Sequence, residues 1–172
     1  QLNQQLGVDL WLTRERSQAA IEIYLDQTID LGNNAETLGV TLSNTDPPAS
    51  GGRRWSELIL NGSALADNTS LLHYTLIHEL GHSLGLEHPF DGSDNDAYRS
   101  LDPERSATPE QTVMSYRQPQ LGNTAWPGSY TASDIQALET IWGAAAAEGP
   151  DRSAPYVIGS TLQGSQLRIR FS

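Results

Sequence analysis

A chain of 172 residues is long enough to bury one hydrophobic core, and because it has no cysteine it must be stabilised by packing, with bound metal as a further source. Ten basic residues against 21 acidic residues give a formal charge of -11, which argues against nucleic acid and anionic membranes as partners. No apolar run approaches the ~20 residues of a membrane span.

The first third of the chain has the alternating pattern of β-strands. Apolar and polar side chains alternate at residues 8–13, 21–26 and 38–43. A period of two in three successive segments indicates a sheet with one buried face. Residues 54–62 predict a further strand that ends in an Asn-Gly turn.

From about Asn68 the period changes to that of a helix. Leucines recur at every fourth position, at Leu72, Leu76, Leu80 and Leu84. They form the apolar stripe of a helix that packs on the sheet. Residues 67–69 offer N-caps, and the helix is expected to end near Gly85 because glycine commonly follows a helix end.

A polar, turn-rich stretch at residues 91–111 separates this helix from a second one. Thr131 and Asp134 fit a capping box at its start, and Gly143 fits its end. The expected buried face of this second helix consists of Ile135, Leu138, Ile141 and Trp142. The remainder, residues 150–172, predicts a tail with short strands.

Three of the four histidines are concentrated in one short segment. His78 and His82 lie four residues apart on the predicted helix, so their imidazoles stand side by side and can take two corners of a zinc tetrahedron. Glu79 projects beside them, where its carboxylate can hold a water without being a ligand. If Gly85 adopts a positive φ, the chain can turn sharply and bring His88 back as a third ligand.

The segment HELGHSLGLEH resembles the H-E-x-x-H-x-x-G-x-x-H signature of the metzincin metalloproteases, and it matches all five specified positions. A second segment, TVMSY at residues 112–116, resembles the Met-turn of that family. Pro89, the MSY tripeptide and DIQALETIWG in the final helix look like the serralysin branch. The resemblance covers roughly residues 8–143.

The resemblance implies an α+β fold of the zincin-like type, with a twisted mixed sheet, an active-site helix, a Met-turn and a C-terminal helix. It implies a catalytic domain at residues 1–149, followed by the tail at 150–172. Within that domain, residues 1–88 form an N-terminal subdomain with the sheet and active-site helix, and residues 89–149 form a C-terminal subdomain. The family's usual first strand and long helix, and the glycine-rich β-roll of secreted serralysins, are not seen in this sequence.

The function implied by the resemblance is that of a zinc-dependent endopeptidase, which hydrolyses peptide bonds by attack of a zinc-bound water activated by Glu79. His78, His82 and His88 would bind Zn²⁺, Met114 would form an apolar floor beneath them, and Tyr116 would reach the zinc or the transition state. The expected partner is a peptide or protein substrate, with no nucleic acid and no membrane, and the expected state is a monomer.

Localisation and substrate binding follow from the same resemblance. The resemblance to serralysins implies a secreted or extracellular protein. No basic segment followed by an apolar one, as in a leader, is visible at the start of the sequence. Because the chain begins at Gln1 and not at a methionine, we expect that it was processed or cut. Without the resemblance, the strand at residues 54–61 would be expected to lie inside the sheet. The family implies instead an edge strand that pairs with an extended substrate.

Several of these assignments have a simpler alternative interpretation. The rival function is a catalytically silent, zinc-containing peptide- or protein-binding module, and an intact Glu79 counts against it. His73 points away from the three other histidines on the helix and is interpreted as structural. Tyr116 can equally pack its ring with its hydroxyl in water. The acidic run Asp91, Asp94 and Asp96 suggests either a Ca²⁺ site or, with better support, a solvated loop.

Overall fold

The computed structural model describes residues 2–8, 10–32, 36–47, 49, 52–93, 95–119 and 125–145, together with the backbone of 167–171. Its strands are β1 (Leu10–Leu12), β2 (Ile21–Asp26), β3 (Gly39–Thr45), β4 (Arg54–Asn61) and β5 (Leu167–Phe171). Its helices are α1 (Leu2–Gln5), α2 (Gly62–Leu65), α3 (Thr69–Ser83) and α4 (Ala132–Trp142). Short 3₁₀ turns occur at Arg16–Gln18 and Pro103–Arg105.

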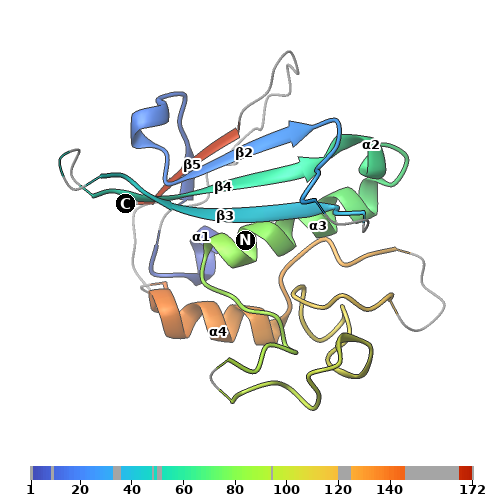
Figure 1. Ribbon diagram of the computed structural model, residues 1–172. Coiled ribbons are helices and arrows are strands. Elements are labelled where there is room, and N and C mark those ends of the chain that lie inside the picture. The colour runs from blue at the N-terminus through green and yellow to red at the C-terminus, as the bar shows by residue number, and fades with distance from the viewer. Residues whose placement is uncertain are drawn as a thin grey trace.

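The strands form one mixed sheet in the order β1-β5-β2-β4-β3. Strands β2 and β4 are parallel, and the other neighbouring pairs are antiparallel. Figure 1 shows α3 lying against one face of this sheet, with α4 farther from it on the same side. A mixed sheet with few helices confirms the α+β class that the sequence predicts.

The position of β4 corrects the expectation that residues 54–61 form an edge strand. β4 pairs in parallel with β2 on one side and antiparallel with β3 on the other, so it is internal. Its core-facing Leu58 and Leu60 are buried, as a central position requires. The edge strand beside β4 is β3, because the segment that precedes β4 in the chain folds back along its free side.

The end of β4 also differs from the prediction of an Asn-Gly turn. Asn61 is the N-cap of α2, and its side-chain oxygen accepts a hydrogen bond from the Ala64 amide at 3.1 Å. Asparagine is among the best N-cap residues, and the residues after it continue into a short helix rather than a hairpin. Here the cap decides the local structure.

Both predicted long helices are present with the expected ends. Asn68 caps α3, and Gly85 follows it with a φ of +100°. Thr131 and Asp134 form the predicted capping box of α4, and Gly143 follows with a φ of +79°. The predicted buried face of α4 is only half right, because Ile135 and Leu138 are buried whereas Ile141 and Trp142 are exposed.

Two hydrophobic clusters flank α3. The first lies between the sheet and α3 and consists of Ile21, Ile23, Leu58, Leu60 and Leu65, with Leu72 and Leu76 of the predicted stripe packed against it. The second lies between α3, α4 and the loops, and it includes Leu6, Tyr74, Leu84, Leu86, Val113, Met114, Tyr130, Ile135 and Leu138. Since α3 contributes to both clusters, it is held from two sides, as a rigid base for a site requires.

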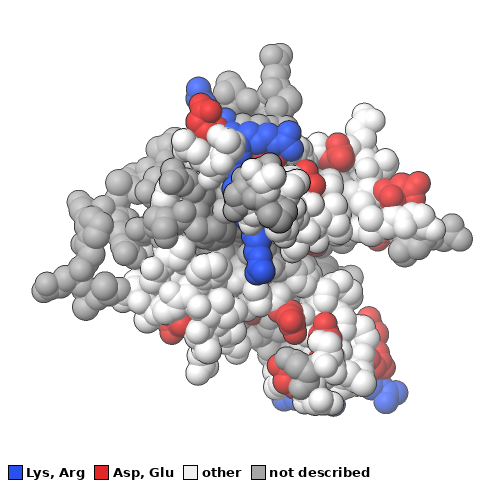
Figure 2. All heavy atoms as spheres, turned by 60° about the vertical axis from the view of Figure 1, so that its left-hand side comes forward, with Lys and Arg blue, Asp and Glu red and all other residues white. Residues whose placement is uncertain are grey.

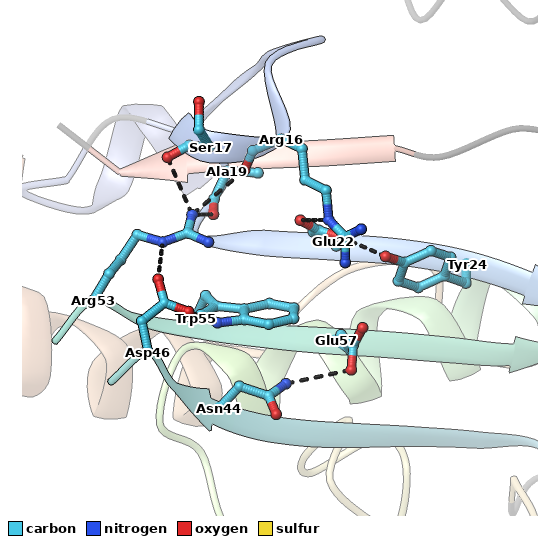
Figure 3. Close-up of polar contacts among 10 residues, drawn as sticks. All are labelled: Arg16, Ser17, Ala19, Glu22, Tyr24, Asn44, Asp46, Arg53, Trp55 and Glu57. Atoms are coloured by element: carbon cyan, nitrogen blue, oxygen red, sulfur yellow. Dashed lines mark hydrogen bonds and ion pairs between the residues drawn. The ribbon is translucent and has the colours of Figure 1, made fainter. Parts of the chain in front are cut away.

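The opposite face of the sheet carries polar contacts (Figure 3). Glu22 alternates with the buried Ile21 and Ile23, so it points away from α3, and yet it is 0% exposed. Its carboxylate accepts hydrogen bonds from the Arg16 guanidinium at 3.0 Å and from the Tyr24 hydroxyl. These charged and polar donors compensate the burial of the carboxylate.

Charge on the surface is unevenly distributed. On the side of the molecule shown in Figure 2, most visible arginine side chains gather in one band, whereas acidic side chains lie around it in several places. On this side the visible acidic side chains are therefore spread out rather than gathered in one patch.

Candidate metal centre

The helix α3 places two histidines next to each other. His78 and His82 are one turn apart, and their ring centroids are separated by 5.0 Å. After Gly85 the chain reverses, and the Leu86 amide donates to the Gly81 carbonyl at 2.9 Å. This closure of the helix end returns His88 to the two helical histidines.

The three imidazoles converge through their Nε2 atoms. His88 Nε2 lies 3.0 Å from His82 Nε2 and 3.3 Å from His78 Nε2. Ligand nitrogens at about 2.1 Å from a tetrahedral zinc are about 3.4 Å apart, so these separations fit one shared ion. Among the described residues, these three histidines form the one group of three or more histidine, cysteine or acidic side chains whose ligand atoms are close enough to hold a metal ion. The structure thus brings together the three histidines singled out in the sequence, while metal binding by them stays a prediction.

The other ring nitrogens of the two helical histidines face backbone carbonyls. His78 Nδ1 lies 2.7 Å from the Val113 oxygen, and His82 Nδ1 lies 2.9 Å from the Leu86 oxygen. A carbonyl oxygen only accepts, so both rings carry their proton on Nδ1 and present an Nε2 lone pair to the centre. Outer contacts of this kind orient histidine ligands in metal sites.

Burial keeps the histidines neutral. It lowers the pKa of His78 to about 3 and that of His88 to about 4, and it lowers the pKa of His82 as well. Neighbouring imidazoles lower the values for His78 and His88 further. Because a metal binds the neutral imidazole, His78 and His88 are in the ligating form well below pH 7, and the lowered pKa of His82 favours the same form.

A methionine lies against the turn of α3 that separates the two helical histidines. Met114 is 1% exposed, and a Cβ built on Gly81 would lie 2.7 Å from its sulfur. Gly81 is therefore required for this close approach, and any side chain there would displace Met114. The contact accounts for a glycine between His78 and His82.

The segment that contains Met114 is fixed by a carboxylate that the sequence marked only as a cap. Asp134 is buried and accepts hydrogen bonds from the Thr112 hydroxyl at 2.5 Å and from the Val113 amide at 3.1 Å. It also accepts from the Thr131 amide at 2.8 Å. Asp134 thereby joins the start of α4 to the residue whose carbonyl faces His78.

Glu79 lies beside the histidines in a buried position. It is 6% exposed, and its Oε2 accepts a hydrogen bond from the Thr41 hydroxyl at 2.8 Å. Burial raises the pKa of Glu79 to about 7, against the lowering effect of the Thr41 hydrogen bond. A carboxylate with a pKa near neutrality can both take up and release a proton near pH 7.

Aromatic rings cover the third histidine. The Phe90 ring stacks on His88 with a centroid separation of 4.8 Å and an interplanar angle of 9°. The Tyr116 ring lies 4.6 Å from His88 and 4.9 Å from Phe90, and Tyr116 is 55% exposed. Burial, followed by the charge of Glu79, raises the pKa of Tyr116, so its hydroxyl stays protonated at neutral pH.

Three contributors to the centre were not identified from the sequence: Thr41, Phe90 and Asp134. Phe90 is two residues after His88 in the sequence, so it could have been identified as a neighbour of that histidine. Thr41 and Asp134 are 38 and 21 residues from the groups they bind, and no local pattern links such distant positions.

Two other sequence assignments lie away from the centre. His73 is exposed on α3 and is outside the group of three histidines. Of the acidic residues considered for Ca²⁺, Asp94 lies outside the described residues. The Ca²⁺ site stays a prediction.

Comparison with known proteins gives one partial match. The chain is 32% identical over 107 residues to Serralysin A of Dickeya chrysanthemi, and the match covers 56% of this chain and 21% of that protein. The chain therefore spans only about a fifth of the length of that relative. No family model and no solved structure matches the chain. None of the described helices has the length and apolar character needed to cross a membrane.

Proposed function

We propose that this chain is a zinc-dependent endopeptidase of the serralysin-like metzincin type. The observation that carries the proposal is the convergence of three Nε2 atoms beside a buried carboxylate, that of Glu79. The partial similarity to a serralysin and the eleven-residue motif support the same reaction class.

The donor set suits zinc. His78, His82 and His88 would hold the ion, and their neutral rings and spacing fit a tetrahedral site with room for a further ligand. When bound, zinc would supply Lewis acidity, which polarises a substrate carbonyl and acidifies a water molecule.

Glu79 is the proposed general base. Its carboxylate accepts a proton from the water that attacks the peptide carbonyl, and it delivers that proton to the departing amine as the carbon–nitrogen bond breaks. The raised pKa of Glu79, at about 7, suits a group that must do both. Tyr116, with its hydroxyl protonated and its ring beside His88, donates a hydrogen bond to the oxyanion.

The substrate is proposed to bind along β3. β3 pairs with β4 on one side and is the last strand in the order of the described sheet, so its other edge can pair with an extended peptide. The same strand carries Thr41, which contacts Glu79, so a peptide paired with β3 would pass close to the proposed base. This assignment moves the expected substrate strand from β4 to β3.

The alternative is a silent zinc-containing binding module that holds a peptide without cleaving it. The position of Glu79 favours catalysis, because a buried carboxylate costs stability and serves no structural pairing beyond Thr41 in the described part of the chain. A secreted location and a monomeric state remain predictions.

The deciding experiment incubates the chain with a denatured protein, with and without a metal chelator, and follows fragments by mass spectrometry. We expect cleavage that the chelator abolishes and added Zn²⁺ restores. The variant Glu79→Gln should bind one zinc per chain and lose about 10²- to 10⁴-fold in rate, the range for loss of a general base. Peptide retention without cleavage by the wild-type chain would support the binding module instead.

A further inference from the structure

Two residues of the edge strand β3, Gly39 and Thr41, lie against the proposed base, Glu79. Gly39 and Thr41 are two residues apart on β3, so both face the same side of the sheet, toward α3. The Thr41 hydroxyl lies 2.8 Å from Glu79 Oε2 and 2.9 Å from the Glu79 carbonyl oxygen. It therefore contacts both the side chain and the backbone of Glu79.

Gly39 leaves the space that this carboxylate occupies. A Cβ at Gly39 would lie 2.7 Å from Glu79 Cγ, 2.8 Å from Glu79 Oε1 and 2.8 Å from Thr75 Cγ2. Gly39 is not among the glycines with positive φ, so its lack of a side chain matters for close approach and not for backbone conformation.

We propose that Gly39 and Thr41 form a clamp that positions the carboxylate of Glu79 for proton transfer. The inference rests on the proposed function, since it assigns positioning residues to the same site. Thr41 fixes Oε2 with a hydrogen bond, and Gly39 fixes the depth to which the side chain enters beneath β3. In the described residues no other group donates to this carboxylate, so Oε1 is left for the attacking water.

The clamp also connects substrate binding to the base. A glutamate has three side-chain torsions, and a base that is free to rotate spends little time in the reactive geometry. The outward main-chain groups of β3 are those proposed to pair with the peptide, while the inward side of the same strand holds Glu79. A peptide that orders β3 therefore also orders the base.

The test compares Thr41→Val, which removes the donor at constant shape, with Thr41→Ser, which keeps it. The matched control is Thr28→Val, an exposed threonine in the loop after β2 and away from β3. For each variant, kcat and KM for one peptide substrate, bound zinc per chain and Tm are measured. We expect Thr41→Val to lower kcat at least about tenfold with KM within about twofold and one zinc retained.

Rescue separates positioning from structure. Thr41→Ser should recover kcat to within about threefold of wild type, and Thr28→Val should match wild type. Gly39→Ala should lower kcat like Thr41→Val, because the added methyl displaces the carboxylate. An unchanged kcat in Thr41→Val, or a loss that follows zinc content or Tm, would overturn the clamp alone. A wild-type chain without chelator-sensitive cleavage would overturn the proposed function, and the clamp with it.

Discussion

The two halves of the molecule contribute to the candidate centre in different ways. The sheet-and-helix half, residues 2–88, supplies all three histidines and Glu79 from α3 and the turn that follows it. The loop half, the described residues between 89 and 145, has one long helix and otherwise mainly turns and irregular segments, and it supplies the Val113 carbonyl, Met114 and the aromatic rings. Local spacing therefore brings the candidate ligands together, and contacts between distant segments orient them.

The halves are also stabilised differently. The sheet and α3 pack through aliphatic residues at regular spacing. The loop half depends in addition on buried hydrogen bonds to backbone groups: Tyr74 donates to the Ser115 carbonyl, Ser115 donates to the Ala107 carbonyl, and Tyr130 donates to the Ile77 carbonyl. When a buried polar group loses its hydrogen-bond partner, the free energy of unfolding falls by more than the net contribution of the bond. Single polar substitutions should therefore destabilise the loop half most.

Removal of a ligand from the helix should have the largest effect. In His82→Ala we expect zinc affinity to fall by more than about 100-fold, because loss of an outer contact alone costs 10- to 100-fold. Competition with a chromophoric chelator measures the change. The exposed His73→Ala on the same helix is the control and should bind zinc like the wild type. Equal losses in both variants would contradict the assignment of the centre.

Removal of Asp134 should show that the loop half depends on buried polar contacts. Asp134→Ala leaves the Val113 amide and the Thr112 hydroxyl without their acceptor, so we expect a loss of about 3 kcal/mol in the free energy of unfolding. Urea denaturation measures it. The control is Asp102→Ala, which removes an exposed cap and should cost about 1 kcal/mol or less. Similar losses would contradict the difference between buried and exposed carboxylates.

Phe90 should have a smaller effect on the centre. Its ring stacks on His88, whose Nδ1 has no hydrogen-bond partner among the described residues, so stacking replaces the carbonyl contact that orients His78 and His82. We expect Phe90→Ala to weaken zinc binding about three- to tenfold, the value of an aromatic pair. Phe90→Tyr should restore binding, and Leu101→Ala, on the exposed surface of the same half, should leave it unchanged.

The smallest expected effect is that of pH on zinc affinity. Protons compete with zinc for imidazole, and the lowered pKa values of His78, at about 3, and His88, at about 4, weaken this competition. Between pH 7.5 and 5.5 we expect less than about a tenfold loss, whereas three ordinary imidazoles would lose about 1000-fold. Calorimetric titration at both pH values measures it. A loss near 1000-fold would show that burial does not keep the rings neutral.

The sequence predicted the parts of the centre that local spacing decides. The four-residue interval between His78 and His82, together with Gly85, predicted two neighbouring histidines on a helix and a turn that returns His88. The structure places the three side chains so, and their role as metal ligands stays a prediction. Period-two alternation located strands at β1, β2 and β3, and the capping box located α4. Each of these signals lies within a few residues of the structure it specifies.

The tertiary structure decided what depends on pairing between distant segments. No local sequence pattern predicts that β3 rather than β4 is the edge strand of the described sheet. The same holds for the burial of Leu138 and the exposure of Ile141 on α4, and for the contact between Thr41 and Glu79. Strand order and side-chain contacts depend on which surfaces meet when the chain collapses, and that choice balances burial against chain entropy over the whole molecule. The spacing of the candidate ligands follows from the helix repeat, whereas the orientation of their rings and the surroundings of Glu79 follow only from the packed fold.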